Sequence, residues 1–113
     1  MPKAQILNKY REEKIIKFIL KEIPKINGIY SLNIKRNIIL KRFVTEDSTK
    51  FTGIKITNFD QGIQIELHIL IYYGSNIPQL CYEIQQRVKE FIESEIGLKI
   101  LSIDITVDGV IYE

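Results

Sequence analysis

The stretch IQIELHILIYY, residues 63–73, decides the fold of this chain. Its aliphatic residues occupy every second position, and mostly polar or aromatic residues lie between them. A period of two is typical of a strand that buries one face. Residues 52–59 alternate in the same way, and Asp60-Gln61-Gly62 forms a tight connection between the two segments. We therefore expect a β-hairpin made of residues 52–59 and 63–73.

The segment after the hairpin carries the signals of a long helix. Asn76 is a good N-cap, Pro78 suits the first turn, and apolar residues follow at helical spacing as far as Ile96. Gly97 is placed for a left-handed C-cap. Residues 100–108 then alternate again. Because roughly 20 residues separate the two strands, a helical crossover and a parallel strand pair are expected.

A second amphipathic helix is expected over residues 9–23, and Pro24 ends it. Residues 33–43 are predicted to be a helix or an irregular connection. The pattern as a whole predicts a two-layer α+β fold. Its mixed sheet of three to four strands is covered on one face by the helices at 9–23 and 77–96.

Composition excludes several classes of protein. The 113 residues are expected to form one domain, residues 1–113, and 45% hydrophobic with 27% charged residues is typical of a globular protein. A net charge of +2 is too small to indicate nucleic acid. A single cysteine, Cys81, suits a reducing compartment. No apolar run approaches the roughly 20 residues of a membrane helix, and no secretory signal follows Met1, so a cytoplasmic protein is expected.

Four short motifs follow one another along residues 53–110. They read Gly53-Ile54-Lys55-Ile56, Tyr73-Gly74-Ser75-Asn76-Ile77-Pro78, Gly97-Leu98 and Val107-Asp108-Gly109-Val110. Their ordered combination resembles the alkaline shock protein family, the envelope stress response family of Gram-positive bacteria. The resemblance implies a non-enzymatic scaffold that acts through protein–protein contacts in the cell-envelope (alkaline) stress response. It implies a protein partner that is membrane-anchored, self-association, or both, with no direct membrane insertion and no catalytic residues or cofactors.

The candidate interaction surface combines polar and aromatic strand residues with a basic segment. Leu70 and Tyr72 are suited to a protein contact on the sheet face opposite the isoleucines. The candidate residues are Lys35, Arg36, Lys41, Arg42, Glu66, His68, Leu70, Tyr72 and Asp104.

Three alternative interpretations accompany this one. The basic segment could bind phosphate, so a small nucleic-acid-binding module using residues 33–43 is the alternative function, although such charges more often form an ordinary exposed edge. His68, Glu66 and Asp104 could bind a metal or transfer protons, and Asp108 would also be near His68 if the last strand is adjacent. A solvated polar face is commoner, and no metal is expected. Cys81 lies at a helix start but within an apolar stripe, so a buried structural thiol is expected.

Overall fold

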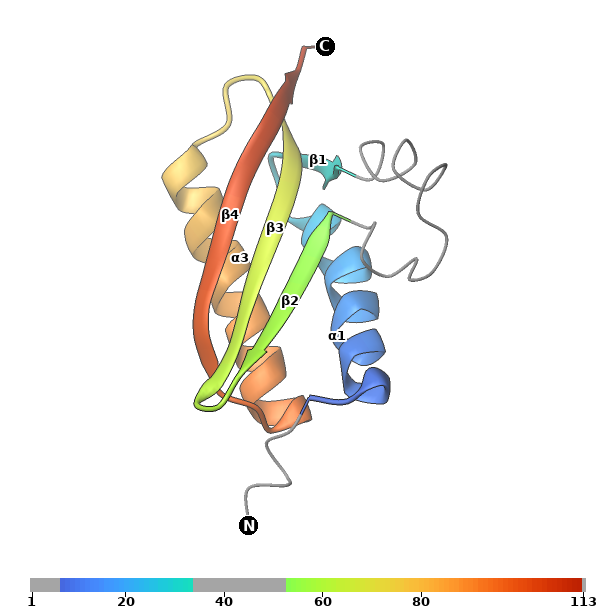
Figure 1. The fold of residues 1–113 in the computed structure, drawn as a ribbon. Helices are drawn as coiled ribbons and strands as arrows, with labels where there is room; N and C mark the ends of the chain where they lie inside the picture. The colour runs from blue at the N-terminus through green and yellow to red at the C-terminus, as the bar shows by residue number, and fades with distance from the viewer. Residues whose placement is uncertain (1–6, 34–52, 113) are drawn as a thin grey trace.

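The fold, a computed structural model, is described over residues 7–33 and 53–112 (Figure 1). Within these ranges, two helices lie on one face of a four-stranded sheet, which confirms the predicted two-layer α+β class. In chain order the elements are α1 (Lys9–Glu22), the 3-10 turn η2 (Ile23–Lys25), β1 (Ile29–Leu32), β2 (Ile54–Phe59), β3 (Gly62–Tyr72), α3 (Ile77–Phe91), the π-helical turn η4 (Ile92–Ile96) and β4 (Ile100–Ile111).

The sheet is mixed, and β3 is its central strand. β2 pairs with β3 as the antiparallel half of the predicted hairpin, and β4 pairs with the other edge of β3 in parallel, as the helical crossover indicated. β1 is the fourth strand. It pairs antiparallel with β3 on the same edge as β2 and beyond its end, so β1 and β2 lie end to end (Figure 1).

The junction between β1 and β2 lies opposite one residue of β3. The Asn33 N–H donates to the His68 carbonyl at 2.8 Å, and the His68 N–H donates to the Gly53 carbonyl at 2.9 Å. Asn33 and Gly53, the ends of the two described ranges, therefore lie at the same point of the sheet. The helix or irregular connection predicted over residues 33–43 lies, after Asn33, outside the described residues.

α1 follows the predicted helix closely. The Asn8 side chain accepts a hydrogen bond from the Arg11 N–H at 2.8 Å, which satisfies an amide that the first helical turn leaves free. The α-helix ends at Glu22, one residue earlier than predicted. Pro24 stands in η2, where its fixed φ suits a tight turn.

The helical segment made of α3 and η4 begins and ends at the predicted capping residues, Asn76 and Gly97. The Asn76 side chain accepts from the Gln79 N–H at 3.1 Å. The predicted helix over residues 77–96 is α-helical only as far as Phe91, and its last turn is the π-helical η4. Gly97 ends it with φ +83°, and its N–H donates to the Ile92 carbonyl at 2.8 Å.

β4 is longer than the predicted strand over residues 100–108. It continues to Ile111, with shifts of register near its start and between Val107 and Gly109. The second shift is a β-bulge, which gives the strand one extra residue and turns side chains toward a new direction. Asp108, the extra residue, belongs to the site described below.

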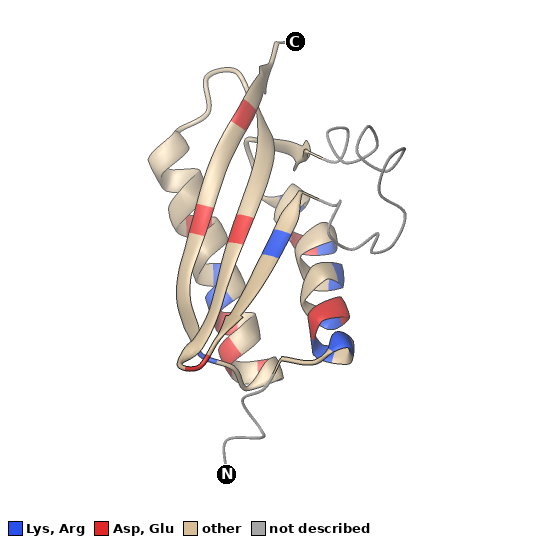
Figure 2. Cartoon of the chain, viewed as in Figure 1, with Lys and Arg blue, Asp and Glu red and all other residues tan. Residues whose placement is uncertain are grey.

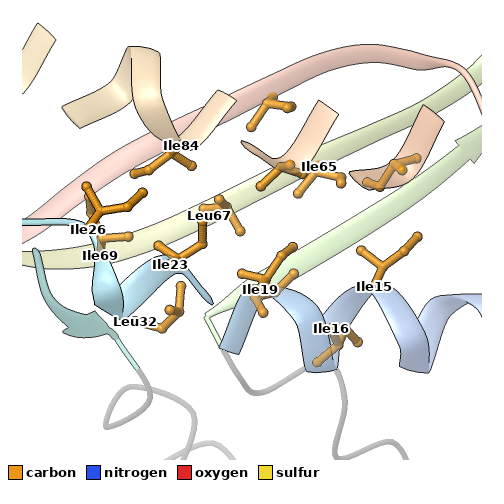
Figure 3. Close-up of a cluster of buried hydrophobic side chains, with 14 of the residues drawn as sticks. Ile15, Ile16, Ile19, Ile23, Ile26, Leu32, Ile65, Leu67, Ile69 and Ile84 are labelled. Carbon is orange, nitrogen blue, oxygen red and sulfur yellow. The ribbon is translucent and has the colours of Figure 1, made fainter. Parts of the chain in front are cut away.

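An isoleucine-rich core fills the space between helices and sheet (Figure 3). Ile19 of α1, Leu67 of β3 and Ile84 of α3 are each 0% exposed and meet in this layer. Burying one such side chain contributes about 1.5–3 kcal/mol. Phe18 stacks on Phe91 with ring centroids 3.9 Å apart, which joins α1 to the end of α3. The core thereby holds the odd-numbered residues of β3 inward and the even-numbered ones outward.

Candidate interaction surface

The face of the sheet turned away from the helices carries part of the predicted site. Four predicted residues, Glu66, His68, Leu70 and Tyr72, alternate with buried residues along β3 and so share this face. Asp104 of β4 pairs with Glu66 and joins them. The structure thus brings five predicted residues together on what we call the open face. Its residues include Tyr30, Asn33, Lys55, Thr57, Gln64, Glu66, His68, Leu70, Tyr72, Ser102, Asp104, Thr106 and Asp108.

A row of charged side chains crosses the open face. Lys55 of β2 pairs with Glu66, and Glu66 pairs with Asp104 of β4. Figure 2 shows the basic band on β2 and the acidic bands on β3 and β4 side by side. The Gln64 side chain donates to the Asp104 carboxylate at 2.6 Å and offsets part of the repulsion between the neighbouring carboxylates. With Asp108, acidic side chains outnumber basic ones on the described strands of this face.

The basic half of the predicted site is not described. Lys35, Arg36, Lys41 and Arg42 lie outside the described residues. Their part in any binding surface stays a prediction, and so does the nucleic-acid module built on residues 33–43. The excess of carboxylates on the described open face would repel phosphate and gives that alternative no support.

A hydrogen-bonded cluster links three strands near the junction of β1 and β2. The Asp108 carboxylate lies 3.1 Å from His68 Nδ1, and Asn33 Nδ2 donates to the same carboxylate oxygen at 2.8 Å. The side chains of His68 and Asp108 are 23% and 19% exposed. The cluster therefore connects both edges of the sheet across β3. Sequence reasoning placed Asp108 near His68 only if the last strand were adjacent, and it missed Asn33.

The histidine cluster differs from the metal or acid–base site that the sequence suggested. His68 contacts Asp108, whereas Asp104 is bonded to Gln64. Over residues 7–33 and 53–112, no group of three or more His, Cys, Asp and Glu side chains is arranged to hold a metal ion. The described residues show an imidazole–carboxylate pair that links β3 to β4.

Tyrosines gather at the end of the sheet where β3 and β4 finish. Tyr30 and Tyr72 meet edge to face, with centroids 5.6 Å apart and an interplanar angle of 87°. Tyr73 and Tyr112 stack at 4.8 Å and remain 69% and 73% exposed. Tyrosine offers a large apolar ring with a polar tip, so this end of the open face is suited to a protein contact.

The motif at residues 73–78, which joins β3 to α3, has a structural role. Its first four residues, together with Gly28, line a shallow hollow of about 590 Å³. The Ser75 hydroxyl lies 2.7 Å from the Tyr72 carbonyl oxygen and 3.0 Å from that of Gly28, and donates to them. Since Asn76 caps α3, the polar groups of the motif fix the helix start and tie it to the chain that precedes β1.

Cys81 is half-buried, so the expectation of a buried thiol is wrong. It lies in the first turns of α3 beside Leu80, which is buried. Burial raises the pKa of the Cys81 thiol above its ordinary value. A raised pKa lowers the thiolate fraction near neutral pH, which is the opposite of what a reactive cysteine needs.

Comparison with solved structures shows the fold in other proteins. One variant of MamM CTD matches with a TM-score of 0.57 at 13% identity, covering 88% of this chain and 96% of that chain. The manganese form of another MamM CTD variant matches with a TM-score of 0.54 at 14% identity, covering 86% and 96%. At such identities the likeness is one of fold alone.

Sequence comparison finds relatives in two bacteria. The uncharacterized protein YloU of Bacillus subtilis (strain 168) is 31% identical over 58 residues, which are 51% of this chain and 48% of the relative. The uncharacterized protein Spy1614 of Streptococcus pyogenes serotype M6 is 29% identical over the same shares. The matched part of the chain spans about half the length of these curated relatives.

Among residues 7–33 and 53–112, no helix combines the length and apolar character that crossing a membrane requires. The sequence model of the alkaline shock protein 23 family, described by a cell envelope-related function, matches residues 5–112. The chain therefore belongs to this family, as the ordered motifs indicated.

Proposed function

We propose that this protein is a non-enzymatic scaffold of the cell-envelope stress response, a single domain over residues 1–113 that binds a protein partner through its open face. The membership of a family with a cell envelope-related function supports the cellular role. The observation that carries the binding role is the open face itself. Within the described residues, both helices lie on the other side of the sheet, and the open face keeps its strand residues partly exposed.

The chemistry of the open face favours a protein as the ligand. Tyr30 is 47% exposed against the half-buried Tyr72, so one end of the face offers aromatic rings. The row of Lys55, Glu66 and Asp104 offers charges of both signs a few residues away. Aromatic anchors beside a polar border are the usual composition of a protein–protein interface.

The partner that fits a cell-envelope role is a protein anchored in the membrane. Such a partner would hold this chain at the membrane periphery without any insertion of its own. The contact would then depend on the tyrosines for affinity and on the charged row for register, since rim charges contribute more to specificity than to affinity.

The test compares two matched double variants of the tagged chain. Tyr30→Ser with Tyr72→Ser removes the aromatic end of the open face. Tyr10→Ser with Tyr82→Ser removes two tyrosines that are 71% and 58% exposed on α1 and α3, and serves as the control. The chains are used to capture proteins from detergent-solubilised membranes, and the captured proteins are quantified by mass spectrometry.

We expect wild type and control to recover the same membrane protein, and the open-face variant to recover about tenfold less or lower still. Loss of two central aromatic contacts commonly costs that much affinity or more. Circular dichroism confirms that both variants remain folded. Equal recovery by all three chains would contradict the use of this face, and recovery of no membrane protein by wild type would contradict the anchored partner.

A further inference from the structure

The two edges of the sheet differ in how they are protected. One edge consists of the short strands β1 and β2, of 4 and 6 residues, and carries Lys55. Short strands and lysines are the usual protection of an exposed edge against pairing with another chain. The other edge is β4, which is 12 residues long and contains no lysine, arginine or proline. Among the described residues, β4 pairs only with β3.

The outer backbone groups of β4 follow from the hydrogen bonds of β3. The His68 N–H and C=O, and the Tyr72 N–H, bond toward β1 and β2, so the odd-numbered residues of β3 bond toward β4. In the matching alternation along β4, three residues between its two register shifts direct their N–H and C=O groups away from β3. They are Ile103, Ile105 and Val107, which we call the β4 edge.

The side chains of the β4 edge point toward the helix layer but do not all reach its interior. Ile105 and Val107 pack against the core and are only half-buried. The Ile103 carbonyl accepts a hydrogen bond from the Gln85 side chain of α3 at 3.1 Å. The core layer therefore ends at this edge with apolar side chains that an added strand would cover.

We propose that two copies of this chain pair through their β4 edges, antiparallel, about a two-fold axis at Ile105. The hydrogen-bonded pairs are Ile105 with Ile105 of the second copy, and Ile103 with the second copy's Val107. These pairs extend the apolar layer from one copy to the other. The Val107 N–H of each copy takes the place of the Gln85 amide at the Ile103 carbonyl, so that carbonyl stays bonded.

The charges of β4 select this register over its neighbours. About Ile105, Asp104 faces the second copy's Thr106 on the open face, and Ser102 faces Asp108. Moving the axis to residue 104 puts Asp104 of one copy opposite Asp104 of the second copy. Moving it to residue 106 puts Asp104 opposite Asp108 at both ends. Like charges directly opposite destabilise a strand pair, so the pairing about Ile105 is favoured over both of these adjacent registers.

The test uses sedimentation equilibrium on the purified full chain. Thr106→Asp places a carboxylate opposite Asp104 at two symmetric positions and should raise the dimer Kd roughly 2- to 30-fold. Adding Asp104→Lys to Thr106→Asp turns both contacts into opposite-charge pairs and should restore the wild-type Kd or tighten it. Thr57→Asp makes the same change on β2, at the other edge of the open face, and should leave the Kd unchanged.

A wild-type chain that stays monomeric at about 1 mM, the weak limit of specific association, would overturn the proposal. So would a dimer that Thr106→Asp leaves intact, or one that the double change fails to restore while circular dichroism shows a folded chain. The inference adds a self-contact to the scaffold proposed above, and it is measured without any other protein. A monomer that still captures its membrane partner through the tyrosines would therefore overturn the pairing alone.

Discussion

Among the described glycines, Gly62 is the one at which an added Cβ would lie closest to another backbone atom, and replacing it by alanine tests the packing of β3 against the start of β4. A Cβ at this residue would lie 2.6 Å from the Lys99 carbonyl oxygen and 3.1 Å from the Leu101 side chain. The Lys99 carbonyl is also the acceptor for the Ile63 N–H, at 2.9 Å. Restoring an ordinary contact moves the carbonyl by about 0.8 Å, which stretches this hydrogen bond beyond its normal range.

The free-energy cost of Gly62→Ala follows from these contacts. The lost hydrogen bond costs about 1 kcal/mol. Crowding in a packed region costs about 1–3 kcal/mol, and the φ of +157° adds further strain for a side chain. We expect the free energy of unfolding to fall by about 3–5 kcal/mol, a large share of what a domain of this size has.

Gly97→Ala is the matched control, because Gly97 has φ +83° but nothing lies within 4 Å of an added Cβ. Its cost should be the backbone strain alone, about 1–2 kcal/mol. Urea unfolding followed by far-UV circular dichroism measures both variants. If the two unfold at the same urea concentration, the close approach of β4 at Gly62 contributes nothing and the reasoning is wrong.

Two further predictions concern α3. Asn76→Ala removes the cap of the helix and should lower the free energy of unfolding by about 1 kcal/mol in urea, with Asn76→Ser costing less; an unchanged midpoint for both would contradict the cap. Because burial raises the pKa of Cys81, iodoacetamide should alkylate it more slowly in the folded chain than in urea near neutral pH. The folded state favours the thiol, so its contribution to stability is complete below the ordinary thiol pKa and is lost as the pH rises through the raised one; equal alkylation rates would argue against the shift.

Local signals in the sequence were sufficient for most of the fold. The alternation of residues 63–73 and the caps at Asn76 and Gly97 each depend on neighbours in the chain, so they could be read without the structure. The parallel pairing of β4 followed from the length of the crossover. The end-to-end placement of β1 and β2 could not be predicted in this way, since it depends on which edge of β3 each strand chooses.

The site was harder to predict than the fold. Strand alternation was enough to place Glu66, His68 and Asp104 on one face. Asp108, which contacts His68, lies at a bulge after Val107, and one extra residue in a strand leaves no clear mark in the sequence. Asn33 reaches the same carboxylate only because β1 ends beside it, which is a tertiary fact.

The pairing of Asn33 and Gly53 with the same residue of β3 separates the sheet from the segment between them. A Cβ on Gly53 would lie 3.2 Å from the Asn33 nitrogen, so the two ends are neighbours in space. The cost of closing a loop grows only by about 0.6 kcal/mol when its length doubles. A change in the number of residues that join Asn33 to Gly53 should therefore cost little stability, because the two ends lie side by side and both strands can keep their register.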